Sequence, residues 1–180
     1  MRLSLPALAL ATILAGACSP VADTPIAQGD TPDFDPITFF DGHTHSWGVI
    51  EDRSGAPTGQ IVTDSHGDRD ATGRLRMVQH LSFHDGTTQQ RDWTLWRNGQ
   101  NLFEATANDM VGTAVGEVNG RIFHWQWVLA RSPGNPLMNV TMNQWMYRMQ
   151  DGSVTIRTTV SKLGLILAEV TEQFTHPEQG

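Results

Sequence analysis

The sequence contains one pair of histidines whose spacing suits a metal ion. His43 and His45 are separated by one residue, and on a β-strand that spacing places both imidazoles on one face, about 7 Å apart. Two such imidazoles can bind one zinc ion if a third ligand comes from a neighbouring strand. His66, His124 and Asp41 could supply it, but no spacing ties any of them to the pair. We therefore predict no metal and no cofactor, with His43 and His45 kept as a weak alternative.

The sequence contains residues that could act as acid or base, but it has no recognisable catalytic motif. The sequence lacks a Gly-x-Ser-x-Gly elbow, a phosphate-binding glycine loop and a His-Glu-x-x-His motif, each of which would point to a specific reaction class. If the protein is an enzyme, we expect Asp109, Tyr147 and Glu169 to act as acid or base, with Lys162 holding a substrate carboxylate. An enzyme that acts on a lipid is therefore an alternative and not the leading prediction.

A different set of residues is suited to an apolar ligand. Met142 and Met146 share one face of a predicted strand with Gln144; methionines make an adaptable apolar wall, and a buried amide needs hydrogen-bond partners. Lys162 ends an apolar row that begins at Val154, so its ammonium would meet a fatty-acid carboxylate or a phosphate at a barrel mouth. The same side chains could simply fill a core. The predicted ligand-binding residues are Gln144, Lys162, Trp93, Met142, Met146 and Trp125.

The segments that must position these residues have the pattern of β-strands. Apolar and polar residues alternate along residues 74–84, 121–130 and 138–148, which is the period of a strand with one buried face. Dipeptides typical of hairpin turns separate such segments, and a sheet of many antiparallel strands loses its exposed edges by closing on itself. We predict an all-β, up-and-down antiparallel barrel of about 8–10 strands, lipocalin-like (calycin-like), with an open sandwich as the second choice. The turn dipeptides are Asp85-Gly86, Asn98-Gly99, Asn119-Gly120 and Asp151-Gly152.

The beginning of the chain predicts export and lipid attachment. Residues 1–17 combine Arg2, a short apolar stretch and small residues before Cys18, as in a lipoprotein signal peptide. Residues 18–36 hold a lipidated Cys18 and a Pro- and Asp-rich tether, and residues 37–180 form one β-barrel domain. Ser19 after the cysteine favours the outer membrane of a Gram-negative bacterium, with the domain facing the periplasm. A freely secreted protein with an N-terminal thiol is the alternative.

The charge of the chain restricts its partners. Twelve basic and 19 acidic residues give a formal charge of −7, whereas nucleic-acid binding depends on clustered Lys and Arg. We predict no nucleic-acid partner. The predicted partners are the membrane, through the N-terminal lipid, and a fatty acyl chain or another apolar ligand.

Short motifs follow one another along residues 37–174. They are Phe40-Asp41-Gly42 through Trp47-Gly48, Asp52-Arg53-Ser54-Gly55, Trp93-Thr94-Leu95, Asn108-Asp109 with Val111-Gly112-Thr113-Ala114, Gln144-Trp145-Met146-Tyr147, and Ser161-Lys162-Leu163-Gly164 before Glu169-Val170. In this order they resemble an exported bacterial family catalogued as domain of unknown function 3833. The resemblance implies a β fold, frequent lipid attachment and genes near lipid-modifying enzymes. The family usually has an acidic residue where Gln144 stands and often Phe where Leu163 stands.

Three functions remain open on the sequence. The leading prediction is an outer-membrane lipoprotein whose barrel binds an apolar or lipid ligand. The alternatives are a packed barrel that serves as an envelope interaction module, through an exposed face with Trp145 and Tyr147, and an enzyme acting on a lipid. A hollow interior would favour the ligand-binding lipoprotein, and a filled interior would favour the interaction module.

Overall fold

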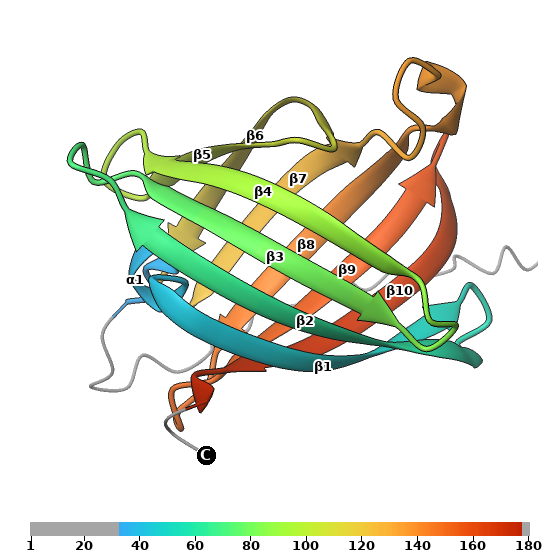
Figure 1. The fold of residues 1–180 in the computed structure, drawn as a ribbon, viewed down its shortest axis with the longest axis horizontal. Helices are drawn as coiled ribbons and strands as arrows, with labels where there is room; N and C mark the ends of the chain where they lie inside the picture. Colours follow the sequence, from blue (N-terminus) through green and yellow to red (C-terminus); the bar gives the residue numbers. More distant parts are fainter. Residues whose placement is uncertain (1–32, 178–180) are drawn as a thin grey trace, which may run out of the picture.

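The structure, a computed structural model, describes residues 33–177. The predicted signal peptide, Cys18 and most of the predicted tether lie outside the described residues. Ten antiparallel strands follow one another around a barrel (Figure 1), and β1 pairs with β10 to close it. The elements are α1 Pro36–Phe39, β1 Gly42–Asp52, β2 Pro57–Arg69, β3 Leu75–Phe83, β4 Thr88–Arg97, β5 Leu102–Ala107, β6 Met110–Asn119, β7 Ile122–Leu129, the 3-10 helix η1 Pro136–Met138, β8 Val140–Arg148, β9 Val154–Lys162 and β10 Leu165–Thr175.

Strand alternation decides which side chains enter the lumen. On β3, Leu75, Met77, Gln79 and Leu81 are buried, while the residues that alternate with them are exposed. On β7, Phe123 and Trp125 are buried in the same way. Successive side chains of a strand point to opposite faces, so these rows line the inside of the barrel. The predicted all-β up-and-down barrel is confirmed, and its closure excludes the open sandwich.

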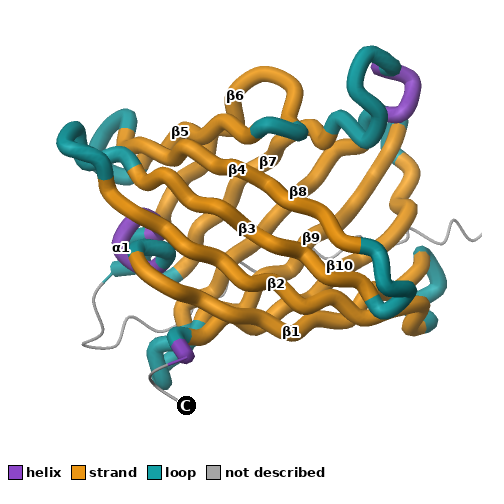
Figure 2. The backbone as a smooth tube through the Cα atoms, in the orientation of Figure 1, coloured by secondary structure: helices purple, strands orange, loops and turns teal. Residues whose placement is uncertain are grey.

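Short turns connect the strands, as Figure 2 shows, where long orange segments alternate with brief teal ones. In four of these turns an aspartate accepts hydrogen bonds from the backbone N–H and the hydroxyl of the Ser or Thr two residues later. These bonds favour the carboxylate form and lower the pKa of each aspartate. The four are Asp52, Asp70, Asp85 and Asp151.

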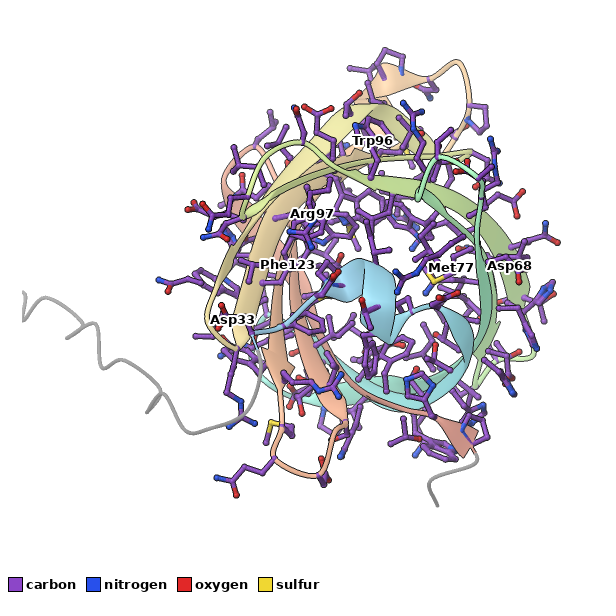
Figure 3. The ribbon with its side chains drawn as sticks, turned by 90° about the vertical axis from the view of Figure 1, so that its left-hand side faces the viewer. Asp33, Asp68, Met77, Trp96, Arg97 and Phe123 are labelled. Atoms are coloured by element: carbon purple, nitrogen blue, oxygen red, sulfur yellow. The ribbon has the colours of Figure 1, made fainter. Side chains whose placement is uncertain are left out.

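One end of the barrel is closed by the chain that precedes β1. Asp35 caps α1 by accepting hydrogen bonds from the backbone N–H groups of Ile37 and Thr38, at 3.0 and 3.3 Å. Phe39 and Phe40 are buried, and Gly67 of β2 has no side chain because a Cβ there would lie 2.0 Å from the Phe40 carbonyl oxygen. Figure 3 views this end and shows α1 lying across the barrel opening. We call it the closed end and the opposite one the open end.

The domain begins earlier than residue 37. Phe34 is 3% exposed and packs edge-on against Phe39, with ring centroids 6.0 Å apart. The backbone N–H of Phe34 also donates to the carbonyl of Gly120, at 2.8 Å. The predicted tether of residues 18–36 is therefore too long, because an aromatic side chain within it contributes to the core that plugs the barrel. No helix within residues 33–177 has the length and apolar character needed to cross a bilayer.

Candidate functional site

The lumen holds polar side chains among the apolar rows. On β3, Gln79 occupies an inward position between Met77 and Leu81. Its amide donates to the Ser65 hydroxyl at 3.1 Å, and its carbonyl accepts from the indole N–H of Trp93 at 2.7 Å. Buried amides need such partners, so Gln79 links β2, β3 and β4 inside the barrel.

Gln144 has the same role on the other side of the lumen. Its carbonyl oxygen accepts from the indole N–H groups of Trp125 and Trp127, at 2.7 and 2.9 Å. Its amide donates to the hydroxyl of Thr158 on β9, at 2.9 Å. An amide nitrogen carries two hydrogens, and within residues 33–177 only one of them has a partner, so one donor of Gln144 is left over at the wall of the lumen.

Three tryptophans and one arginine lie between these two amides. Trp93 stacks on Trp125 with ring centroids 5.2 Å apart, and Trp127 meets Trp93 edge-on at the same distance. The guanidinium of Arg91 lies 4.8 Å from the Trp127 ring centroid and 5.8 Å from that of Trp93. Such cation–π contacts stabilise a partly desolvated charge. The arrangement places a cation on an aromatic wall inside the barrel.

Arg91 is 8% exposed, and in the described part of the chain a carboxylate contacts its guanidinium only at Nε. Its Nε donates to both carboxylate oxygens of Asp109, at 2.9 and 2.8 Å. Its hydrogen bonds to residues 33–177 come from Nε alone, so the Nη groups keep their donors. A guanidinium in this state is suited to a carboxylate or phosphate.

Glu172 adds a carboxyl group to the same space. Its Oε1 accepts from the hydroxyls of Ser46 and Thr63, both at 2.9 Å. Burial of the carboxyl group raises the pKa of Glu172, while the two hydroxyls and the positive charge of Arg91 act in the opposite direction. Because desolvation is the largest effect, the pKa of Glu172 lies above its usual value. When it is protonated, this carboxyl group can donate a hydrogen bond.

These groups surround one cavity in the lumen. It has a volume of about 60 Å³ and is lined by Gln79, Arg91, Gln144, Glu172 and apolar side chains that include Met77 and Met146. A space of that size holds a few water molecules, whereas pockets for drug-sized ligands measure roughly 300–1,000 Å³. The lumen is thus mostly filled, and the small space that remains is bordered by both polar and apolar side chains.

The residues predicted to bind a ligand do not all reach this cavity. Trp93, Trp125, Gln144 and Met146 line it. Met142 packs against the edge of the core. The Lys162 ammonium instead donates to the carbonyl oxygen of Leu137, beside η1 at the open end. Curvature of the sheet into a barrel joins the first four, because Trp93 of β4 stacks on Trp125 of β7, and β7 pairs with β8, which carries Gln144 and Met146.

The three residues considered for acid–base chemistry lie apart. Asp109, in the turn between β5 and β6, pairs with the buried Arg91 of β4. Glu169 pairs with Arg157 on the outer face, at 2.6 Å, and this contact raises the pKa of Arg157. Tyr147 lines a groove outside the barrel, next to Met149. The three do not form one catalytic site.

The histidine pair faces outward and meets an aspartate. Asp64 of β2 lies 2.7 Å from His45 Nδ1 and 3.4 Å from His43 Nε2, and these contacts lower the pKa of Asp64. The ring of His66 stacks on that of His43, with centroids 4.3 Å apart. Within residues 33–177 no group of three or more His, Cys, Asp or Glu side chains has an arrangement that could hold a metal ion.

The other two proposed third ligands are engaged elsewhere. Asp41 pairs with Arg69, at 2.7 Å. His124 lies 2.7 Å from the Asn143 side-chain oxygen and stacks on Trp145. Neither one joins His43 and His45.

The family of the chain follows from a comparison with protein-family models. The model described as Protein of unknown function (DUF3833) matches residues 12–176. The chain belongs to this family. The resemblance drawn from the ordered motifs is thereby confirmed. A search of the curated proteins finds no match to the DUF3833 chain.

A solved structure shares the fold of this DUF3833 protein. The S-type phycobiliprotein lyase CPES from Guillardia theta matches with a TM-score of 0.60 and 6% sequence identity, over 78% of this chain and 89% of that one. At this identity the likeness concerns the fold alone. The barrel is lipocalin-like, in agreement with the predicted fold class.

Sequence reasoning missed Gln79, Arg91 and Glu172 as lumen residues of the DUF3833 protein. A signal for them exists in the alternation, since each occupies an inward position in a row of mostly apolar or small residues. A polar residue at such a position must find a partner inside. The alternation does not predict that these three residues line the same cavity, because they come from three different strands.

Proposed function

We propose that this DUF3833 protein binds an amphipathic ligand in its barrel, with the polar head group at Arg91 and the apolar part against the tryptophans. The guanidinium of Arg91 carries the proposal, because it faces the cavity with unused donors. A structural arginine would be expected to saturate its donors with protein acceptors. A carboxylate or phosphate fits that guanidinium best.

The surroundings of Arg91 agree with an acidic head group. A charged Glu172 would repel an anion, but burial favours the neutral form of that side chain. The remaining amide hydrogen of Gln144 is a donor for ligand oxygens, and the carboxyl group of Glu172 becomes a second donor when it is protonated. The lumen thus offers positive charge and donors at its centre and aromatic rings around them.

An acyl chain needs more room than about 60 Å³. Met77 and Met146 line the cavity, and unbranched methionine side chains rearrange readily. We therefore propose that binding displaces these methionines. The ligand would enter from the open end, since α1 covers the other end.

Native mass spectrometry tests ligand binding. The protein should be exported to a bacterial periplasm, purified without detergent, and should begin at or before Asp33, because Phe34 belongs to the core. The expected result is a reproducible added mass that organic solvent releases. Protein that carries no added mass and takes up neither fatty acids nor phospholipids would contradict the proposal, and would favour the packed interaction module instead.

A matched pair of variants locates the binding site. In Arg91→Met with Asp109→Asn, the guanidinium is removed without leaving a carboxylate uncompensated, and the added mass should be lost. Arg74→Met is the control, because Arg74 lies over the Trp96 ring outside the lumen. Equal loss in both variants, or in neither, would contradict a head-group role for Arg91.

We further propose that the protein is an outer-membrane lipoprotein facing the periplasm. Residues 1–17 and Cys18 support this proposal by their sequence alone. The mass of the N-terminal peptide after export tests it: acylation of Cys18 should add the mass of a diacylglyceryl group, and Cys18→Ser should abolish that addition. A wild-type peptide without added mass would contradict the lipid anchor.

A further inference from the structure

Large apolar side chains are exposed at the open end of the barrel. Leu163 is 94% exposed, Leu137 79% and Leu165 71%. Two segments carry them, the hairpin between β9 and β10 and the segment around η1, both far from α1 in Figure 1. Exposed apolar groups that gather in this way mark interaction sites. The set, here called the apolar rim, is Leu137, Met138, Leu163, Leu165, Ile166 and Leu167.

A contact joins the two segments of the apolar rim. The ammonium of Lys162, the last residue of β9, donates to the carbonyl oxygen of Leu137. The paired strands β8 and β9 continue from this point, with Thr141 opposite Ser161. The apolar rim is therefore one surface on adjacent strands.

The backbone conformation at the hairpin tip disfavours a leucine at position 163. Leu163 has φ +50° and Gly164 φ +79°, a conformation that favours Asn, Asp or Gly at both positions of a tight hairpin turn. For a leucine this conformation is strained, and its side chain, at 94% exposure, packs on almost nothing that could compensate. Strain of this kind persists where it serves a function.

The shape of the apolar rim suits a fluid apolar layer. Leu165, Ile166 and Leu167 are consecutive and all exposed, although neighbours on a strand point to opposite faces. A groove on a protein partner would cover one face, whereas a lipid layer surrounds a protruding hairpin. Lys162 borders the apolar rim, and Arg131 lies in the same β7–β8 connection as Leu137. Long basic side chains beside an apolar surface can reach lipid phosphates.

The chain before the barrel is long enough for this orientation. Residues 19–32 separate Cys18 from the first described residue and reach roughly 45 Å when fully extended. The 11 residues of β10 cover about 35 Å along the strand. A lipid on Cys18 can thus occupy the same membrane that the open end faces, even though Asp33 lies at the closed end.

We propose that the apolar rim inserts into the surface layer of a phospholipid membrane and holds the open end of the barrel against it. This inference rests on the proposed function, because it gives the lumen direct access to a lipid source. It names the partner surface as phospholipid.

Vesicle flotation tests the proposal with the exported protein carrying Cys18→Ser, so that no lipid anchor contributes. We expect this protein to float with vesicles of phosphatidylethanolamine and phosphatidylglycerol. Leu163→Asn with Leu165→Gln should weaken binding by about tenfold for each leucine that enters the apolar layer fully. The matched control, Val78→Thr with Leu102→Gln, removes exposed apolar groups elsewhere on the barrel and should bind as the parent does.

Three results would overturn membrane docking. They are failure of the Cys18→Ser protein to bind vesicles, unchanged binding of the Leu163/Leu165 variant, and equal weakening in the control. Circular dichroism of each variant identifies a loss that comes from misfolding. Since ligand binding is read by native mass spectrometry and lipidation by peptide mass, a vesicle result that overturns docking is distinguishable from failure of the proposed function.

Discussion

Replacing Gln144 with leucine should destabilise the barrel strongly although the two side chains are similar in size. The change removes the acceptor of two indole N–H groups and the donor to Thr158. Trp125 and Trp127 are 6% and 3% exposed, and each buried donor left without a partner costs about 1–3 kcal/mol. Allowing for the added apolar contact of leucine, we expect a loss of about 2–4 kcal/mol in the free energy of unfolding.

Urea unfolding followed by tryptophan fluorescence measures this loss, and a thermal scan should show a fall in Tm of about 10 °C. The control is Gln126→Leu, which alters a glutamine on β7 between the same two tryptophans. Gln126 faces outward and donates only to Asn143, at 3.3 Å, so its replacement should change stability by less than about 0.5 kcal/mol. A Gln144→Leu protein as stable as the Gln126→Leu protein would refute the role assigned to the buried amide.

Four further predictions follow from the described contacts. Glu172→Gln should gain stability relative to the wild type as pH rises above about 4.5, because the raised pKa of Glu172 means that the unfolded chain ionises first and the stability of the wild type declines; urea unfolding at pH 4 and pH 8 measures this, and a difference independent of pH would contradict it. Asp70→Ala should lose stability at neutral pH, and this loss should shrink as pH falls below about 3.8 toward the lowered pKa of Asp70, because the carboxylate stabilises the fold only while it is charged; the same acid titration of both proteins tests this, and an equal difference at every pH would refute it. Leu163→Asn should raise stability by about 0.5–1 kcal/mol, because asparagine tolerates the left-handed backbone at this position; a fall in Tm would refute the strain argument. Phe34→Ala should cost about 3–5 kcal/mol in urea unfolding, whereas a residue in a tether would cost nothing.

Much of the fold could be predicted because its signals are local. The inward rows of β3 and β7 were visible in the alternation around Met77 and Trp125. The glycines of the Asp85-Gly86 and Asp151-Gly152 dipeptides have positive φ, as hairpin turns require. Phe34 was not recognised because its burial depends on the closed end of a barrel that forms from residues far along the chain.

The candidate site could be predicted only in part. Gln144 was identified as an amide on an apolar face, and the structure gives it partners on β7 and β9. Tyr147 was grouped with Asp109, but Tyr147 lines a groove outside the barrel while Asp109 pairs with the buried Arg91. The strand face on which a residue lies follows from the residues next to it in the sequence. The residues that it contacts across the lumen do not.

The sequence alone determined the strands, their turns and the face on which most side chains lie, because a period of two and the turn residues act over a few neighbours. The tertiary structure alone decided that Arg91 meets Asp109, that Glu172 meets Ser46 and Thr63, and that the exposed leucines gather at one end. The contact of Glu172 with Ser46 exists only after β1 pairs with β10. Closure brings residues as far apart in the sequence as Ser46 and Glu172 within hydrogen-bond distance, and no local sequence pattern predicts that contact.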